Sequence, residues 1–311
     1  MKSAPLVSIL IPSFKASRFL RTALDSIYAQ DYRPLEIVVA DGGSNDGTVE
    51  ILREYQARYP DTLRWISEKD GGPADAVNKA LTLARGEFAA ILSADDFYYP
   101  GAVKPIVLLM QERPDCGLVY GDVSGVDESG SITYTRRMPD FSWEAFFGVS
   151  CTLPQGSVFF RMDLARRTGD WNAAYYGCDL DYWLRLCFQT NPLHIPRVLS
   201  AWRRYEGQRT SPAAYRRIWD DYWRMIDESP DLDTAAPRLQ RLACASKHLL
   251  VLRLDLGIGT WRTLRHLLTG LWLHPTFWYY NPWQLTAAMF PGSGFLRSLY
   301  RLVRGRSRNT R

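Results

Sequence analysis

The sequence has few of the features that mark membrane-spanning, disulfide-rich or repetitive proteins. No run reaches the ~18 uninterrupted apolar residues of a spanning helix, and the apolar stretch after Met1 is shorter than the h-region of a signal peptide. The five cysteines are odd in number and form no CxxC pair, which predicts neither a disulfide framework nor a zinc site and favours a reducing compartment. We find no internal repeat.

Acidic residues are almost absent from the last quarter of the chain. Residues 238–311 contain twelve basic side chains and one acid, Asp255, whereas residues 1–237 carry a net charge of −6. The 311 residues, 46% of them hydrophobic, suffice for one large domain or two small ones with a real core. We therefore expect two parts, 1–237 and 238–311, that meet different surroundings.

Short apolar runs alternate with amphipathic segments in the first half of the chain. Strands are expected at 6–11, 35–40, 63–67, 88–92, 118–126, 131–134 and 156–160. Helices are expected at 17–29, 48–58, 73–84 and 180–190, with Ser17 as the N-cap of the first. Unbroken apolar strands that alternate with helices predict an α/β fold with a parallel sheet covered on both faces.

Polar clusters follow three of the expected strands, at Pro12–Lys15, Asp41–Asp46 and Ser93–Asp96. Ligands of open α/β sheets bind beyond the carboxyl ends of the strands, so these clusters mark the expected site. Adjacent Asp95 and Asp96 suit a hard divalent cation such as Mg²⁺ or Mn²⁺. The simpler interpretation of an isolated Asp-Asp pair is a solvated turn.

A second pair of carboxylates, Asp179 and Asp181, flanks the start of the helix expected at 180–190. Carboxylates at this position can cap a helix and interact with its dipole. A carboxylate there could also act as a general base that accepts a proton from an attacking hydroxyl.

Six segments together resemble family 2 of the glycosyltransferases over about the first 190 residues. They are VSILIPSF at 7–14, Gln30 with EIVVADGGSNDGT at 36–48, SEKDGGPADAVNKAL at 67–81, ILSADDFYYPGAV at 91–103, QGSVFFR at 155–161 and GCDLDYWLRL at 177–186. The resemblance implies a GT-A fold, a Rossmann-like mixed sheet flanked by helices. It also implies an inverting transfer of a sugar from a nucleotide-sugar, with a UDP-sugar favoured as donor.

The resemblance also implies roles for individual residues. The nucleotide-sugar would be bound by Pro12, Ser13, Phe14, Asp41, Asn78, Lys79 and Asp95. Asp95 and Asp96 would hold Mg²⁺ or Mn²⁺, and Asp179 would be the catalytic base, supported by Trp183 and Arg185 on its helix.

Three positions depart from the family pattern, each at a place where a charged or metal-binding side chain is usual. Ser93 stands where the acidic motif usually opens with Asp, and Cys178 stands where an acid usually precedes the base. Tyr205 replaces a histidine that can touch the metal or diphosphate, which leaves the third metal ligand unassigned.

The tail at 238–311 matches no motif. Its Trp and Leu residues recur at helical spacing among arginines, and Pro275, Pro282 and Pro291 divide its apolar region. We expect a helical, basic, aromatic-rich extension that either packs on the catalytic domain, 1–237, or docks on an anionic membrane surface. Docking on the cytoplasmic face and action on a glycan or lipid-linked acceptor, in polysaccharide or cell-envelope biosynthesis, are the corresponding hypotheses. No motif supports a nucleic-acid partner.

Two other functions remain open from the sequence. A degenerate nucleotide-sugar-binding module would fit the departures at Ser93, Cys178 and Tyr205. A nucleotidyltransferase is less favoured, because the segment IPSFKASRF lacks the Gly-rich loop that such enzymes need.

Overall fold

The computed structural model describes residues 4–147, 152–210, 212–254, 268–270 and 272–273. The chain divides into two compact units. Unit 1 comprises residues 1–141 and 152–221, and unit 2 comprises residues 142–151 and 222–311. The apolar and arginine-rich segments expected from residue 274 onward lie outside the described residues.

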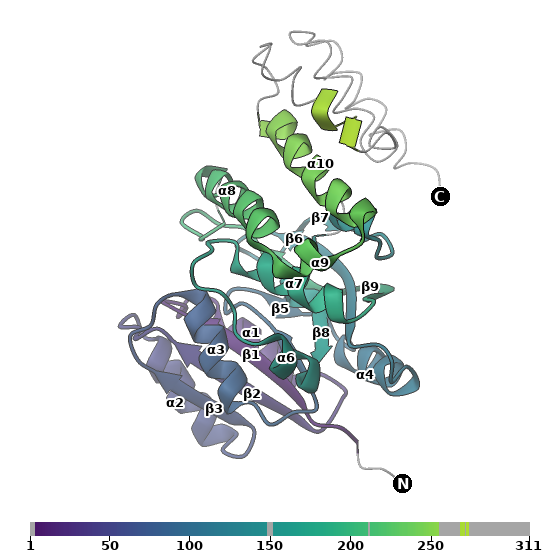
Figure 1. Cartoon of the computed structure of the whole chain (residues 1–311). Helices are drawn as coiled ribbons and strands as arrows, with labels where there is room; N and C mark the ends of the chain where they lie inside the picture. The colour runs from purple at the N-terminus through teal and green to yellow at the C-terminus, as the bar shows by residue number, and fades with distance from the viewer. Residues whose placement is uncertain (1–3, 148–151, 211, 255–267, 271, 274–311) are drawn as a thin grey trace. The chain divides into compact units, whose positions relative to one another are not determined.

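A nine-stranded mixed sheet forms the centre of unit 1, in the order β3-β2-β1-β4-β8-β6-β9-β5, with β7 paired to β6 (Figure 1). The strands are β1 (Val7–Ser13), β2 (Leu35–Asp41), β3 (Leu63–Ser67), β4 (Phe88–Ile91), β5 (Phe97–Tyr98), β6 (Leu118–Val126), β7 (Ile132–Arg136), β8 (Val158–Arg161) and β9 (Leu193–Arg203). The four strands from β3 to β4 are parallel, as the alternating pattern predicts. The sheet becomes mixed at β8, which runs antiparallel to β4 and β6.

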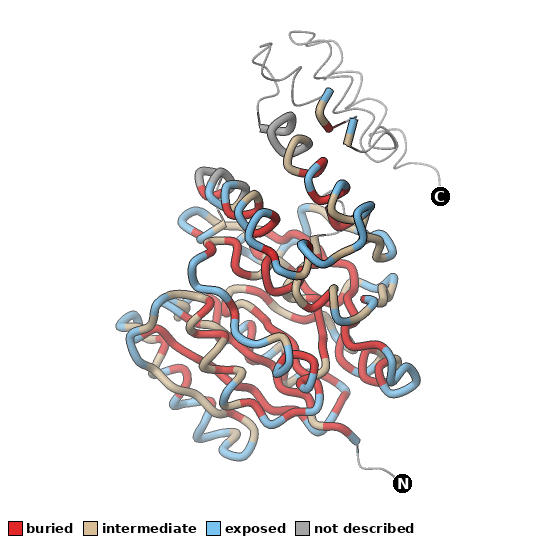
Figure 2. Tube along the Cα trace, viewed as in Figure 1, coloured by how far each residue is buried: buried red, intermediate tan, exposed pale blue. Residues whose placement is uncertain are grey.

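Helices cover both faces of this sheet. They are α1 (Leu20–Tyr28), α2 (Thr48–Arg58), α3 (Pro73–Leu83), α4 (Val103–Glu112), α6 (Met162–Thr168), α7 (Cys178–Gln189) and α8 (Pro212–Glu228), which continues into unit 2. Alternate residues of β1, such as Ile9, share one apolar core with α1, α2 and α4. The buried face of α3 is mostly alanine and packs on β1 and β2, where small side chains permit a close approach. Buried positions therefore follow the strands and the inner faces of the helices (Figure 2).

Two expected helix starts are wrong. Ser17 does not cap α1, which begins at Leu20; the Ser17 backbone N–H instead donates to the Asp46 carboxylate at 3.1 Å. Helix α7 begins at Cys178 with Gly177 as its N-cap, so Asp179 lies within its first turn, together with Asp181, and not before the helix. Helix boundaries depend on local caps that hydrophobic spacing does not encode.

Unit 2 is helical in its described part, which includes α5 (Trp143–Phe147), α9 (Pro230–Thr234) and α10 (Pro237–Leu254). The Tyr222 hydroxyl lies 3.0 Å from Ser246 Oγ, and Arg238 pairs with Glu144 at 3.0 Å. The helical character expected for the start of the tail is thus confirmed over α10. None of the helices in the described ranges is long and apolar enough to cross a membrane.

Buried Gln30 ties α1 to the segment that enters α4. Its amide nitrogen donates to the carbonyls of Ser26 (2.9 Å) and Tyr99 (3.0 Å), and its oxygen accepts from the backbone N–H groups of Ala102 (2.9 Å) and Val103 (3.3 Å). Because all of these hydrogen bonds are made, the buried amide fixes the segment between β5 and α4.

We expect Gln30→Ala to lower the free energy of unfolding by about 2–3 kcal/mol, because buried backbone groups lose their partners. Urea denaturation measures the change. The matched control is Gln56→Ala, since the exposed Gln56 only accepts one bond, from Trp65 Nε1 at 3.0 Å, and should change stability by about 0.5 kcal/mol or less. Equal effects of the two substitutions would contradict a structural role for Gln30.

Candidate active site

The carboxyl ends of β1, β2 and β3 bring Ser13, Asp41 and Ser67 into register. Asp41 is only 2% exposed, and its carboxylate accepts hydrogen bonds from Ser44 N (2.8 Å), Ser44 Oγ (2.6 Å) and Ser67 Oγ (2.6 Å). These bonds hold the loop after β2 closed, with Gly43 at a φ of 78° that favours glycine. The strand ends thus bring polar side chains together at one edge of the sheet, where the sequence predicts a ligand site.

Two groups at this edge are placed to meet a ligand. The Ser13 hydroxyl is buried and has no hydrogen-bond partner among the described residues. A buried hydroxyl without a partner is costly unless a ligand or water satisfies it. Phe14 exposes 62% of its surface, with Lys15 Nζ 5.4 Å from the ring centroid, so its face is available for stacking.

The acidic turn after β4, which carries Asp95 and Asp96, accepts hydrogen bonds from residues at the end of β9. Asp96 accepts a hydrogen bond from the Arg203 backbone N–H at 2.9 Å, and Asp95 accepts one from the Tyr205 hydroxyl at 3.0 Å. The Arg203 side chain is 3% exposed and donates to the carbonyls of Asp95 (2.9 Å) and Glu128 (2.7 Å). Residues 203 and 205 therefore hold both carboxylates from one strand end.

Burial makes the ionised form of both carboxylates unfavourable. It raises the pKa of Asp95, and it raises the pKa of Asp96 well above the ordinary value, with the Asp95 charge as a further cause. The Arg203 cation opposes both shifts. A divalent cation would relieve this repulsion, so the chemistry of the pair fits a metal site.

The number of side chains that could bind a metal at this turn is small. Within the ranges that the structure describes, no three His, Cys, Asp or Glu side chains are grouped to hold a metal ion. Asp95 and Asp96 provide two carboxylates, and Mg²⁺ is commonly held by one or two carboxylates together with substrate phosphates. The residues present therefore fit a cation that is completed by a phosphate ligand.

Asp179 lies in the first turn of α7. Burial raises the pKa of Asp179, while the Leu180 backbone N–H and the Arg209 guanidinium oppose the rise. Arg209 is held in place by Tyr176: its Nη2 donates to the Tyr176 carbonyl at 2.6 Å, and the Tyr176 hydroxyl donates to the Arg209 carbonyl at 2.7 Å. A carboxylate with a raised pKa and a nearby cation can serve as a general base near neutral pH.

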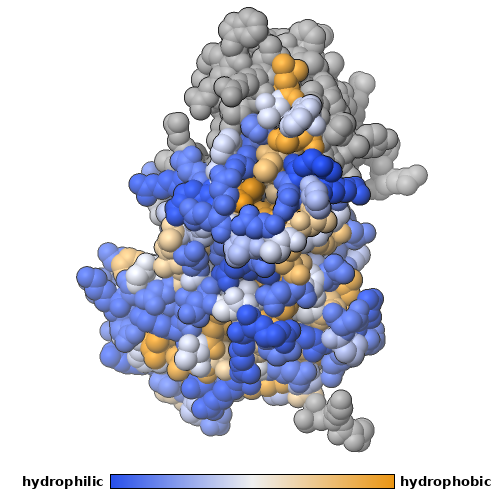
Figure 3. Space-filling model, viewed as in Figure 1, coloured by the Kyte–Doolittle hydropathy of each residue, from blue (hydrophilic) through white to orange (hydrophobic). Residues whose placement is uncertain are grey.

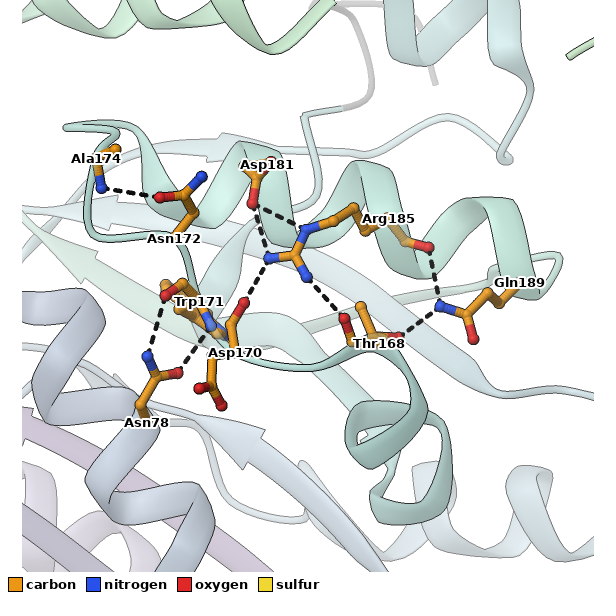
Figure 4. A network of polar contacts seen from close by, with 9 residues as sticks. All are labelled: Asn78, Thr168, Asp170, Trp171, Asn172, Ala174, Asp181, Arg185 and Gln189. Carbon is orange, nitrogen blue, oxygen red and sulfur yellow. Dashed lines mark hydrogen bonds and ion pairs between the residues drawn. The ribbon is translucent and has the colours of Figure 1, made fainter. Parts of the chain in front are cut away.

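The other carboxylate of this turn, Asp181, has a structural role. Its Oδ2 accepts from Arg185 Nε (3.0 Å) and Nη2 (2.8 Å), and Arg185 also donates to the carbonyls of Thr168 (2.9 Å) and Asp170 (2.7 Å) (Figure 4). Arg185 thus fastens the segment before α7 to the helix itself. Arg185 thereby supports α7, and the role of Asp179 on that helix as a catalytic base stays a prediction.

Asn78, expected near the diphosphate, is joined to the same segment. Its Nδ2 donates to the Trp171 carbonyl at 3.0 Å and its Oδ1 accepts from the Trp171 N–H at 2.8 Å (Figure 4). Both polar groups of the amide are therefore engaged, and Asn78 links α3 to the segment that leads into α7. Lys79 pairs with Glu68 (2.9 Å) and Asp75 (3.3 Å). Their contact with a ligand stays a prediction.

Two site residues escaped the sequence interpretation. The sequence pattern does not single out Arg203, although a buried arginine beside two acids is the natural counter-charge. Arg209 carries no spacing signal, because it is brought to α7 by the loop between β9 and α8. The Ser93 hydroxyl accepts from Gln155 Nε2 at 3.3 Å, which adds a third contact to the acidic turn.

Comparisons with solved structures define the class of fold. The chain resembles TarS of Staphylococcus aureus in complex with UDP-GlcNAc with a TM-score of 0.66 at 16% identity, over 91% of this chain and 83% of that one. It resembles the mannosyltransferase PcManGT of Pyrobaculum calidifontis, in complex with GDP-Man and Mn²⁺, with a TM-score of 0.54 at 22% identity, over 93% and 87% of the two chains. The fold is therefore the expected GT-A fold, a mixed sheet flanked by helices.

The family follows from the sequence comparisons. The model of glycosyl transferase family 2 matches residues 8–164, about half of the chain, and the chain belongs to this family. Chondroitin synthase of Escherichia coli is 30% identical over 236 residues, 74% of this chain and 33% of that protein. A PGL/p-HBAD biosynthesis glycosyltransferase of Mycobacterium tuberculosis is 30% identical over 204 residues, 63% and 75% of the two chains. The chain spans only 33% of the chondroitin synthase and 23% of a Sinorhizobium fredii relative.

We expect Asp96→Asn to stabilise the protein in the absence of ligand. The amide removes a buried charge whose ionisation is unfavourable, and its oxygen can still accept from the Arg203 N–H. A gain of about 1 kcal/mol would raise Tm by ~2–4 °C in a domain of this size. Differential scanning fluorimetry measures it, with Asp61→Asn at an exposed turn as the control. A lower Tm for Asp96→Asn would show that the charge stabilises the fold.

Proposed function

We propose that this chain is an inverting, metal-dependent glycosyltransferase that moves a sugar from a UDP-sugar to a hydroxyl of a glycan or lipid-linked acceptor. The observation that carries the proposal is the desolvated pair Asp95 and Asp96 at the carboxyl end of β4. Membership of glycosyl transferase family 2 supports the transfer chemistry. The names of the Escherichia coli and Mycobacterium relatives support a place in polysaccharide or cell-envelope biosynthesis.

The donor would lie across the carboxyl edge of the parallel strands. Phe14 would stack on the base, and the unpartnered Ser13 hydroxyl would hydrogen-bond to the nucleoside beside Asp41. Pro12, the residue before Ser13 in β1, would line the same pocket. Asp95 and Asp96 would hold Mg²⁺ or Mn²⁺, which neutralises charge on the diphosphate when bound.

The transfer itself would be a direct displacement. The Asp179 carboxylate takes the proton of the acceptor hydroxyl as that oxygen bonds to the anomeric carbon. The bond from the anomeric carbon to the diphosphate oxygen breaks, and its electron pair leaves with the nucleoside diphosphate. Attack opposite to the leaving group inverts the anomeric configuration.

We also propose that the tail docks on an anionic membrane surface. Leu268 and Trp272, four residues apart, expose 57% and 81% of their surfaces in the described part of the tail. An exposed tryptophan and an exposed leucine, in a segment rich in arginine, suit the interface between headgroups and acyl chains. Hydrophilic side chains predominate elsewhere on the face shown in Figure 3.

Ligand-dependent stabilisation tests the donor site. We expect UDP with Mn²⁺ to raise Tm, whereas UDP alone or Mn²⁺ alone raises it little. The diphosphate of UDP would complete the ligands of Mn²⁺, and Mn²⁺ would neutralise charge on the diphosphate. At a hundredfold excess over Kd the stabilisation is about 2.7 kcal/mol, which a melting curve resolves. GDP, CDP and dTDP are the comparison ligands. A larger rise in Tm with GDP than with UDP would indicate a GDP-sugar as donor. No shift with any of the four and metal would contradict a nucleotide-sugar site.

Substitution of the base tests the chemistry. We expect Asp179→Asn to lower kcat by about 10²–10⁴ with little change in UDP binding, since the amide keeps the shape but cannot accept the proton. Turnover is measured by release of nucleoside diphosphate. The control is Asp170→Asn, an exposed residue just before α7. Near-normal turnover of Asp179→Asn would favour a binding module or another base.

The pH profile should carry the same signature. The basic form of Asp179 exists above its pKa, which burial raises, so kcat/KM should fall as the pH drops through a value above that of an ordinary carboxyl group. Arg209→Gln removes the cation that favours the charged form, so this acidic limb should move to higher pH.

A further inference from the structure

Tyr205 makes a contact that its residue type does not require. Tyrosine on a partly exposed loop can leave its hydroxyl in water, yet Tyr205 directs its hydroxyl to Oδ2 of Asp95 at 3.0 Å. The Asp95 carboxylate is itself mostly removed from water. A neutral hydroxyl that donates to a desolvated carboxylate fixes the carboxylate plane without cancelling its charge.

The tyrosine is held in this orientation from several sides. Its ring lies 5.0 Å from the ring of Phe19, which in turn lies 4.5 Å from the Arg203 guanidinium. Its backbone N–H donates to Gln208 Oε1 at 2.9 Å, and buried Gln208 donates onward to the Thr210 carbonyl at 3.0 Å. The aromatic ring and the backbone are thus both fixed before any ligand arrives.

The same strand end grips the other carboxylate, because the Arg203 N–H donates to Asp96. The two carboxylates are therefore both oriented by protein donors, from residues 203 and 205. Tyr205 thus acts on the acidic turn through its hydrogen bond to Asp95. Among the described residues no third carboxylate, histidine or thiol joins the pair.

We propose that Tyr205 is a positioning residue that orients Asp95 for a divalent cation, so that the cation is held firmly only when a nucleoside diphosphate completes its ligands. This inference rests on the proposed function, since it concerns the metal of that site. Residues that hydrogen-bond to metal ligands typically change metal affinity by about 10–100-fold when they are removed.

The test is a Mn²⁺ titration followed by electron paramagnetic resonance, in the presence of saturating UDP. We expect Tyr205→Phe to weaken Mn²⁺ binding by about 10–100-fold. In an Asp95→Asn background the same substitution should have no further effect, because its action passes through Asp95. Equal Mn²⁺ affinity of the wild type and Tyr205→Phe, or an undiminished effect in Asp95→Asn, would overturn the inference.

Tyr99→Phe is the matched control, since the half-buried Tyr99 hydroxyl lies 2.5 Å from Ser124 Oγ and not at the acidic turn. It should leave Mn²⁺ affinity unchanged. Tyr205→Trp gives a second variant if Tyr205→Phe fails to fold, because an indole N–H can donate to Asp95 but cannot bind the metal, and it should keep the affinity within about tenfold of the wild type. A larger loss in that variant counts against the inference. Absence of Mn²⁺ binding by the wild type with UDP would instead contradict the proposed function.

Discussion

The burial of two adjacent carboxylates, Asp95 and Asp96, is the constraint on which the rest of the site depends. Neither can be left in an apolar sheet edge without compensation, because desolvation disfavours their charge and each repels the other. The fold meets this with one buried arginine, Arg203, and with hydrogen bonds from the end of β9. These partners leave the pKa of both acids raised, so part of the cost remains. A cation and a diphosphate can offset this remaining cost of ionising the two carboxylates when they bind.

A second constraint concerns the distance along the chain between the parts of the site. The proposed donor edge comes from β1 to β4, whereas the proposed base, Asp179, belongs to α7, about a hundred residues later. Asn78 closes this gap by binding both backbone groups of Trp171, and Arg185 fastens the same segment to α7. Catalysis needs reacting groups held in a fixed geometry, so these structural bonds serve the chemistry without touching it.

The parallel half of the sheet could be predicted because each of its strands is an unbroken apolar run that ends in a polar cluster. This rule places Asp41 and Asp95 at the same edge, since strand ends of a parallel sheet share one edge. The antiparallel strands β8 and β9 carry weaker patterns, and their pairing is decided by contacts distant in sequence. The partners of the acidic turn, Arg203 and Tyr205, lie beyond that limit, because no local period records which loop returns to β4. The start of α7 was misplaced for a related reason: Gly177 caps it without a side chain.

Two of the three departures from the family pattern, Ser93 and Cys178, have the same electrostatic effect. Ser93 adds a hydroxyl that stabilises the Asp96 charge, where a third carboxylate would increase the repulsion in the acidic turn. Burial raises the pKa of Cys178 to about 12, so its thiol stays neutral beside Asp179, where an acid would push the pKa of the base higher. Tyr205 places a neutral donor at Asp95. Ser93 and Cys178 each place a neutral group where the family has a carboxylate, which leaves the neighbouring buried carboxylates easier to ionise before ligands bind. Such a site has less need of a tightly held resident cation, and a cation that arrives with its diphosphate satisfies the same charges.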